Sequence, residues 1–243
     1  MLEALLVNIQ NISAKGAKCL AVFDLDSTLF DVSPRLERIL LDFAAEPEFQ
    51  KRFPEQVALF KGIKTRHTDW GFTNALQRIG LDGKHPDFEE ALHDYWYERF
   101  FSNEYLEFDH PSEGAVEFVK DVVEAGAEIA YLTGRDVQRM GPGSESVLRK
   151  WNFPINDRAR LILKPHKSMD DAEFKTDWIV GEVNQNKFEK IYFFDNEPVI
   201  LHRMNDKCPQ VQIYFLDTTH SGKAHPPENL PRLLNFLRNP KGS

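Results

Sequence analysis

Cysteine is scarce in this sequence, with Cys19 and Cys208 as the two examples among 243 residues. Two cysteines can form at most one disulfide, and neither has the Cys-x-x-Cys partner of a zinc site. Cys19 starts an apolar run, where a small buried core residue is its ordinary role. The sequence therefore lacks the cysteine pattern of a disulfide scaffold or of a cysteine-bound zinc centre.

Long apolar runs are missing as well, because no stretch approaches the ~20 residues that a membrane-spanning helix needs. Near the start, apolar residues recur at a helical period over 2–12, with an early acid, no basic segment and no small-residue cleavage site. This pattern predicts an amphipathic helix and not a signal peptide. We therefore expect a cytoplasmic protein that makes no membrane contact.

Basic residues are outnumbered, since 30 lysines and arginines face 38 acidic residues and give a formal charge of −8. A global excess of acid makes nucleic-acid binding unlikely as a general property, although it leaves room for a local basic pocket. The phosphate-binding pattern Gly-x-x-x-x-Gly-Lys is absent, so the glycine- and proline-containing segment 138–144 is predicted to form a loop. Residues 239–243 are predicted to be a frayed tail.

What the sequence does contain is a series of strand-like apolar runs, separated in the later part by helical patterns. This alternation predicts an α/β, Rossmann-like three-layer core, in which helices cover both faces of a parallel sheet. The expected helices lie over 112–126, 144–151 and 171–180. The expected strands lie over 19–23, 128–132, 160–163, 191–194 and 211–216.

Residues 31–109 interrupt the alternation, because no convincing strand occurs there and helix-forming and aromatic residues are frequent. We predict an inserted α-helical cap over 31–109 and a discontinuous core formed by 1–30 and 110–243. The aromatic run 94–105 fits either a lid over a substrate or, more ordinarily, the cap's own hydrophobic core. A basic cluster in the cap fits either a grip on a second anionic group or a solvated face. That cluster is Lys61, Lys64, Arg66 and His67.

The first strand-like run leads into two carboxylates and a hydroxyl, Asp24, Asp26 and Thr28. Carboxylates beside a buried strand are costly unless something pairs with them. Along an extended chain the two aspartates would point the same way about 6.6 Å apart, so they could flank one reacting group as nucleophile and general acid/base. Thr133 and Asp195 also follow strand-like runs, and ligands of parallel sheets bind beyond the carboxyl ends of the strands.

Three segments, 24–28, 131–135 and 192–196, together resemble the ordered motifs of the haloacid dehalogenase (HAD) superfamily. They read Asp-Leu-Asp-Ser-Thr, Tyr-Leu-Thr-Gly-Arg and Tyr-Phe-Phe-Asp-Asn. The resemblance covers 19–30 and 111–216, and the helical segment lies where that superfamily inserts a cap of the first type. It implies a phosphatase-type hydrolase that forms an aspartyl-phosphate intermediate. An aspartate at position 26 favours phosphoryl transfer, because the dehalogenases of the superfamily lack it.

The resemblance implies a role for each matched residue. Asp24 would be the nucleophile, and Asp26 would protonate the leaving group and then activate water, which requires its pKa to lie above that of Asp24. The Thr133 hydroxyl and the Gly134 amide would hold phosphate oxygens, since glycine permits close backbone approach. Thr28 would brace the loop.

The family's phosphate-binding lysine is harder to place in this sequence. Lys175, near the start of a helix that runs back to the last catalytic strand, is the favoured candidate. Lys164, directly after a strand, is the runner-up, and Lys167 is a further candidate. Two roles are open for Arg135: it could contact the cap or the substrate, or it could form a surface salt bridge.

A carboxylate nucleophile repels a phosphate dianion, and at ~4 Å with an effective dielectric constant of ~20 the two charge pairs cost roughly 8 kcal/mol. A hard divalent ion with oxygen ligands, such as Mg²⁺, offsets this repulsion. The resemblance implies Asp24, the backbone carbonyl of Asp26, and Asp195 as its ligands. Asn196 departs from the family's commonest pattern of a second acid, and it can supply a neutral oxygen directly or through water, with weaker metal binding.

The leading hypothesis from the sequence is therefore a Mg²⁺-dependent phosphatase that acts on a small phosphorylated substrate. A phosphomutase or a polynucleotide-end phosphatase would use the same motifs, and net acidity weighs against the second. A non-catalytic binding protein that keeps the fold is a third reading. The intact set of Asp24, Asp26, Thr133 and Asp195 speaks against that reading.

Overall fold

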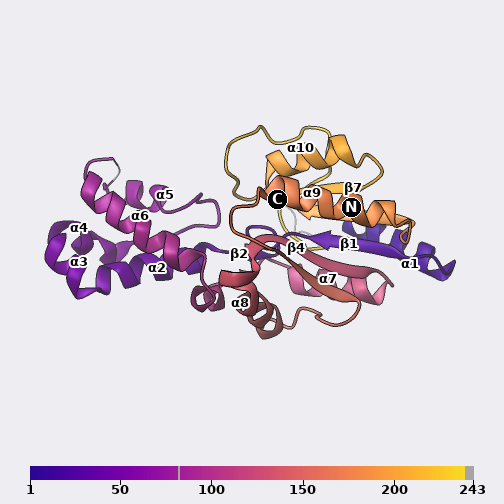
Figure 1. Ribbon diagram of the computed structural model, residues 1–243, viewed down its shortest axis with the longest axis horizontal. Coiled ribbons are helices and arrows are strands. Elements are labelled where there is room, and N and C mark those ends of the chain that lie inside the picture. The colour runs from indigo at the N-terminus through magenta and orange to yellow at the C-terminus, as the bar shows by residue number, and fades with distance from the viewer. Residues whose placement is uncertain (82, 239–243) are drawn as a thin grey trace.

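The computed structural model describes residues 1–81 and 83–238, which form a sheet-containing part and a helical part lying side by side (Figure 1). The frayed tail predicted for 239–243 lies outside the described residues. The sheet has six strands in the order β5-β4-β1-β6-β7-β8, and every neighbouring pair is parallel. Its strands are β1 (Cys19–Phe23), β4 (Glu128–Asp136), β5 (Ala159–Lys164), β6 (Lys190–Asp195), β7 (Gln212–Leu216) and β8 (Arg232–Leu233).

The five predicted strands and the parallel sheet are thus confirmed. The sixth strand, β8, is two residues long and carries no apolar run that could have marked it. β1 occupies the middle of the sheet, and all five of its residues are buried. Alternate residues of β1 belong to two different hydrophobic clusters, with Ala21 and Phe23 in one and Leu20 and Val22 in the other. A strand covered on both faces explains its unbroken apolar sequence.

Helices cover the two faces of the sheet, as the three-layer prediction requires (Figure 1). On one face lie α1 (Leu2–Ala14) and α7 (Ala115–Glu124), and on the other lie α9 (Asp171–Asn184) and α10 (Pro198–Lys207). The apolar residues of α1 are buried at helical spacing, so the amphipathic helix predicted over 2–12 is confirmed. Cys19 is a buried, free core cysteine, and so is Cys208.

The loop predicted for 138–144 is wrong, because these residues lie inside α8 (Val137–Lys150). The Asp136 carboxylate caps this helix by accepting a hydrogen bond from the Arg139 N–H at 3.0 Å. A Cβ at Gly143 would lie 2.7 Å from the backbone oxygen of Asn103, so the glycine allows close helix packing and does not mark a turn. Pro142 lies inside the helix, at its sixth residue, where it has no N–H to donate to the Gln138 carbonyl.

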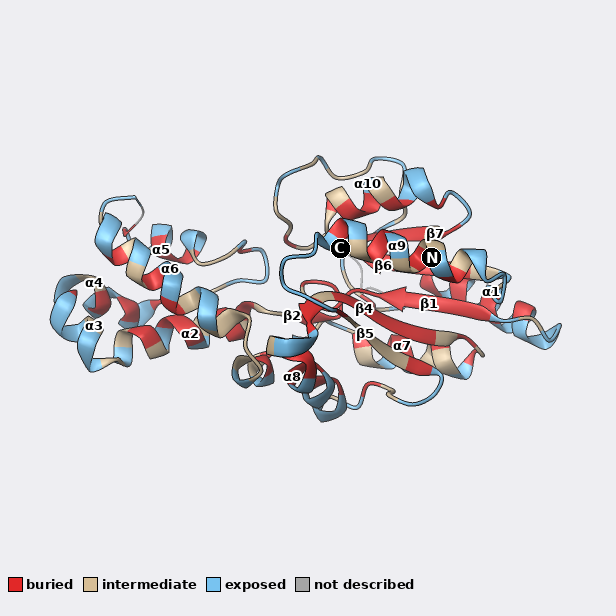
Figure 2. Cartoon of the chain, in the orientation of Figure 1, coloured by how far each residue is buried: buried red, intermediate tan, exposed pale blue. Residues whose placement is uncertain are grey.

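The helical part has its own hydrophobic cluster, in which Ile39, Phe43 and Leu92 are fully buried (Figure 2). The chain enters it after β2 (Phe30–Asp31) and returns through β3 (His110–Pro111), and these two strands pair antiparallel. Asp31 is therefore a strand residue inside the segment expected to contain none. The elements between are α2 (Ser33–Ala45), α3 (Pro47–Arg52), α4 (Pro54–Ala58), η1 (Leu59–Gly62), α5 (Thr73–Arg78), α6 (Pro86–Phe100) and η2 (Glu104–Phe108).

The separate hydrophobic cluster of the helical part and the pairing of β2 with β3 support treating 31–109 as a cap domain. The boundaries of this domain stay a prediction. Among the helices of residues 1–81 and 83–238, none combines the length and the apolarity needed to cross a membrane. The cytoplasmic location also stays a prediction.

Candidate active site

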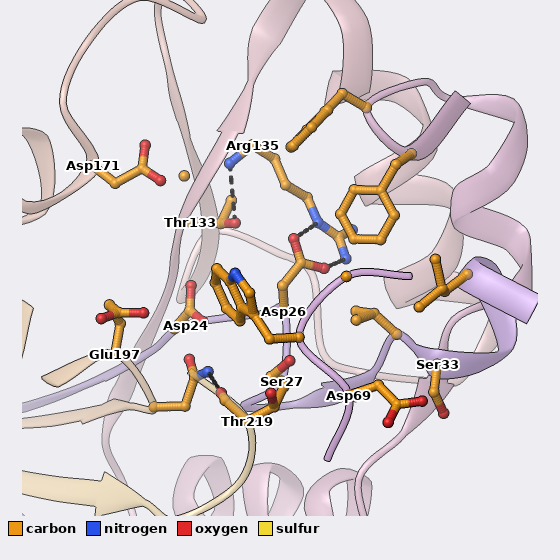
Figure 3. A pocket seen from close by; sticks show the side chains of 18 of the residues that line it. Asp24, Asp26, Ser27, Ser33, Asp69, Thr133, Arg135, Asp171, Glu197 and Thr219 are labelled. Carbon is orange, nitrogen blue, oxygen red and sulfur yellow. Dashed lines mark hydrogen bonds and ion pairs between the residues drawn. The ribbon is translucent and has the colours of Figure 1, made fainter. Parts of the chain in front are cut away.

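Asp24 and Asp26 stand on a tight turn at the carboxyl end of β1. The Asp24 N–H donates to the Phe194 carbonyl at 3.0 Å, which extends the pairing of β1 with β6 by one residue. The chain then reverses through Ser27, whose φ of 58° is a left-handed value that costs of order 1–3 kcal/mol for a residue other than glycine. Both aspartates line one cavity of about 330 Å³ between the sheet edge and the helical part (Figure 3).

Lys175 is the lysine that the fold brings to Asp24. Its Nζ donates to Asp24 Oδ1 at 2.6 Å and to Asp195 Oδ2 at 2.7 Å, and all three side chains are buried. Lys164 instead donates to the Met169 carbonyl at 2.9 Å and pairs with Asp171. The geometry therefore favours Lys175 over Lys164, and phosphate binding by Lys175 stays a prediction.

The cluster of Asp24, Asp195 and Lys175, called here the lysine cluster, has two carboxylates for one ammonium. Burial is the largest effect on Asp24 and raises its pKa to about 7, with a further upward contribution from Asp195 and an opposing one from Lys175. Burial also raises the pKa of Asp195, against the pull of Lys175. The uncompensated negative charge of this buried cluster attracts a cation. A bound cation would in turn lower the pKa of Asp24 and keep its carboxylate ionised.

Asp26 belongs to a second cluster, called here the arginine cluster, with Arg35, Asp109 and Arg135. Arg135 Nη2 donates to Asp26 at 2.6 Å and to Asp109 at 2.7 Å, while Arg35 pairs with the same two carboxylates. Both guanidinium groups and Asp109 are almost fully buried. Arg135 is therefore not a surface salt bridge: it links Asp26 to Asp109, the last residue of the predicted cap segment, as the expected cap contact requires.

The arginine cluster reverses the expected order of the two aspartate pKa values. Burial alone would raise the pKa of Asp26, but Arg135 and Arg35 together hold it far below its usual range. The division of labour expected from the sequence needs Asp26 to have the higher pKa. In this arrangement Asp26 is an ionised acceptor, and it must separate from at least one arginine before it can carry a proton to a leaving group.

Thr133 and Gly134 line the same cavity, near the end of β4. The pairing of β4 with β5 shifts between Thr133 and Asp136, so the intervening residues leave the regular ladder. A Cβ at Gly134 would lie 2.6 Å from Asp171 Oδ2, so a larger residue here would require the Asp171 side chain to move. The Asp171 carboxylate lies at this edge of the cavity too, and it is paired with Lys164 (Figure 3).

The predicted metal ligands meet at the ends of β1 and β6. Asp195 Oδ1 accepts a hydrogen bond from the Glu197 N–H at 2.8 Å. The Asn196 amide is already engaged, because its Nδ2 donates to the Thr219 carbonyl and its Oδ1 accepts from the Thr28 hydroxyl at 3.3 Å. Thr28 therefore braces the loop through Asn196.

The donor set fits a hard cation by its chemistry, since it offers carboxylate oxygens and a surplus negative charge. In the part of the chain that the structure describes, no three acidic, histidine or cysteine side chains form a ready-made metal cage. A metal here would depend on Asp24 and Asp195, backbone and water oxygens, with Asn196 as a neutral neighbour.

Sequence reasoning missed Arg35 and Asp109, which complete the arginine cluster. Arg35 lies one helical turn before Ile39 and two before Phe43, both buried, so it occupies the apolar face of α2. An arginine on an apolar helix face is a usable signal, because such a charge needs a buried partner. Asp109 carries no comparable signal, since it follows the short helix η2 without a local pattern.

No protein-family model matches the sequence, and neither does any curated protein. Solved structures match its fold. A haloacid dehalogenase-like hydrolase of Burkholderia xenovorans is 16% identical and has a TM-score of 0.50, with 90% of this chain and 94% of that chain covered. A HAD-superfamily hydrolase of Ehrlichia chaffeensis is 10% identical with a TM-score of 0.50, over 89% of this chain and 91% of that one.

A third similar structure is protein tyrosine kinase A of Mycobacterium tuberculosis, which is 15% identical and has a TM-score of 0.50. The match covers 89% of this chain and 93% of that one. The resemblance inferred from the three sequence motifs is thereby confirmed at the level of the fold. The chain has the α/β fold of the haloacid dehalogenase-like hydrolases, with a helical insertion after its first strand.

Proposed function

We propose that this chain is a Mg²⁺-dependent phosphatase that hydrolyses a small phosphorylated substrate through an aspartyl-phosphate. The observation that carries the proposal is the lysine cluster, in which a buried Asp24 shares one ammonium with Asp195 at the edge of a cavity. The surplus negative charge there would repel a phosphate dianion unless a divalent cation were present. Asp24 and Asp195 would hold that Mg²⁺, which would neutralise charge on the transferring phosphoryl group.

In the first half-reaction, an Asp24 carboxylate oxygen attacks phosphorus and the ester bond to the leaving-group oxygen breaks. The leaving oxygen takes a proton from Asp26 once that residue has parted from an arginine and has itself taken up a proton from solvent. Lys175, the Thr133 hydroxyl and the Gly134 N–H balance the charge on the phosphoryl oxygens. In the second half-reaction, water loses a proton to Asp26 and attacks phosphorus, which releases phosphate and restores the Asp24 carboxylate.

The proposal is tested by assaying the purified chain on p-nitrophenyl phosphate with Mg²⁺ and with EDTA. We expect hydrolysis only with the metal, and a loss of at least ~10³-fold in kcat for Asp24→Asn, because the nucleophile is gone. Asp206→Asn is the matched control, since this exposed aspartate on α10 lies outside the cavity and should leave kcat unchanged. Equal rates in EDTA, or in Asp24→Asn, would reject the mechanism.

A further inference from the structure

Four aromatic rings of the helical part, called here the aromatic wall, line the cavity together with the polar side chains of Ser33, Arg66, His67 and Asp69. Trp70, Trp96, Phe100 and Phe101 all line the cavity that holds Asp24 and Asp26. These rings come from the end of α6 and from the loop between η1 and α5. The rings themselves offer a substrate a flat apolar surface.

Trp70 is the most exposed ring of this wall, with 53% of its surface accessible. Its loop is nevertheless fixed in place, because the buried Asp69 carboxylate accepts from Arg78 Nη1 at 2.8 Å and from the Arg66 N–H at 2.8 Å. Arg78 Nη2 also donates to the Lys64 carbonyl at 2.7 Å. These hydrogen bonds therefore fix the position of the loop, and the exposed indole of Trp70 is available to a ligand in the cavity.

The other rings are packed against one another. The ring centroid of Trp96 lies 5.2 Å from that of Phe100 and 6.0 Å from that of Phe101. The Arg35 guanidinium covers the Phe100 ring at 4.3 Å, so the arginine cluster also fixes this part of the wall. Mutual packing holds these rings in place, and among the described residues the buried Trp96 indole N–H has no hydrogen-bond partner.

This wall discriminates between kinds of phosphate ester. The hydroxyl groups of a sugar phosphate would lose water against the rings without gaining hydrogen bonds, which is unfavourable. A planar aromatic group would instead stack on an indole face, an interaction that tolerates any base or aryl ring. A cavity of about 330 Å³ is within the size range of sites for small organic ligands.

We propose that the substrate is a phosphate monoester that carries a planar aromatic group, such as a nucleoside monophosphate. The aromatic group lies against Trp70 and the phosphoryl group lies at Asp24. This inference rests on the proposed function and narrows it, because a sugar phosphate without a base would satisfy the catalytic residues but leave the aromatic wall uncovered.

Adenosine 5′-monophosphate and ribose 5-phosphate form a suitable pair of probes, since both break the same ester bond to a primary ribose carbon. We expect kcat/KM for the nucleotide to exceed that for ribose 5-phosphate by about 5- to 100-fold, the usual range for one base stacked on an aromatic side chain. Trp70→Ala should bring the ratio close to one, and Trp70→Phe should restore part of it. Leu59→Ala, which removes an exposed apolar side chain of the same helical part outside the cavity, should leave the ratio unchanged.

Binding measured by calorimetry to Asp24→Asn separates this inference from the proposed function. Tighter binding of the nucleotide than of ribose 5-phosphate, without turnover by the wild type, would support the aromatic site and reject the phosphatase. Turnover with a ratio near one, unchanged in Trp70→Ala, would reject the aromatic site and keep the phosphatase. Faster turnover of ribose 5-phosphate than of the nucleotide would likewise reject the aromatic site.

Discussion

Asp24 and Asp26 are two residues apart in the chain, yet their side chains belong to clusters with different charge balance. The lysine cluster sets one ammonium against two carboxylates, whereas the arginine cluster sets two guanidinium groups against two carboxylates. The lysine cluster has one uncompensated negative charge, which can bind a cation or take part in a chemical step. The arginine cluster is neutral, and each of its members has a partner.

The two clusters also join different parts of the molecule. Asp24, Asp195 and Lys175 come from β1, β6 and α9, all within the sheet-containing part. The arginine cluster includes Arg35 at the start of α2 and Asp109 just before β3, which are the places where the chain enters and leaves the helical part. The lysine cluster therefore has the surplus charge that the proposed reaction requires, while the arginine cluster ties the helical part to Asp26.

The largest effect on stability is expected from removing one arginine of the arginine cluster. Arg35→Met should lower the free energy of unfolding by about 3–5 kcal/mol, because it leaves buried carboxylates without their partner. Arg38→Met is the matched control on the same helix: Arg38 pairs with Asp42 on the surface, and its loss should cost less than about 1 kcal/mol. Urea unfolding monitored by circular dichroism measures both, and equal losses would contradict a special role for the arginine cluster.

The two lysines near the sheet edge should differ in their effect on catalysis. Lys175→Met should lower kcat by roughly 10²–10³-fold, since it removes the cation that balances charge at Asp24. Lys164→Met, which breaks a pair with the half-exposed Asp171 side chain, should lower kcat by less than about tenfold. Steady-state kinetics on folded variants decides between them. A larger effect from Lys164→Met would transfer the phosphate-binding role to that lysine.

The surplus charge of the lysine cluster predicts that Asp24→Asn stabilises the metal-free protein. The pKa of Asp24 rises from 3.8 to about 7 on folding, so the folded state binds the proton more tightly and stability falls as pH rises between these values. In EDTA, we expect Asp24→Asn to raise Tm by roughly 5 °C at pH 8, and by clearly less at pH 5. Scanning calorimetry at the two pH values tests this, and a pH-independent difference would contradict it.

The smallest expected effect is the stabilisation of the wild type by metal. Mg²⁺ at about five times its dissociation constant should stabilise the folded chain by about 1 kcal/mol, equivalent to roughly 2–4 °C in Tm. Asp195→Asn should remove most of this shift, whereas Glu113→Gln should keep it, because Glu113 accepts a hydrogen bond from Asn235 and does not line the cavity. A metal-dependent shift that persists in Asp195→Asn would place the metal elsewhere.

The sequence predicted the sheet and the meeting of Asp24 with Asp195 because local patterns specify both, whereas Lys175 was the favoured one of three lysines for a role that the family resemblance implied. Apolar runs mark the strands, and a parallel sheet necessarily brings the residues after β1 and β6 together. The arginine cluster depends instead on where the helical part folds back, which sets Asp109 beside Asp26 over a long sequence separation. No periodicity in the sequence encodes that contact.

Residues 138–144 are a second place where the sequence alone could not predict the structure. Glycine and proline usually mark turns, so the segment was interpreted as a loop. In the structure these residues continue α8, and Gly143 is small because the backbone of Asn103 packs directly against it. A glycine that allows close packing and a glycine that allows a turn look identical until the tertiary neighbour is known.

The central claim is that Asp24 carries the phosphoryl group, and acid quenching during turnover tests it most directly. Mass spectrometry of the quenched wild type, digested at low pH, should find one phosphoryl group on the peptide that contains Asp24, and hydroxylamine should remove it. Asp24→Asn should show none. Rapid turnover without any phosphorylated peptide, or with the phosphoryl group on another residue, would contradict the account.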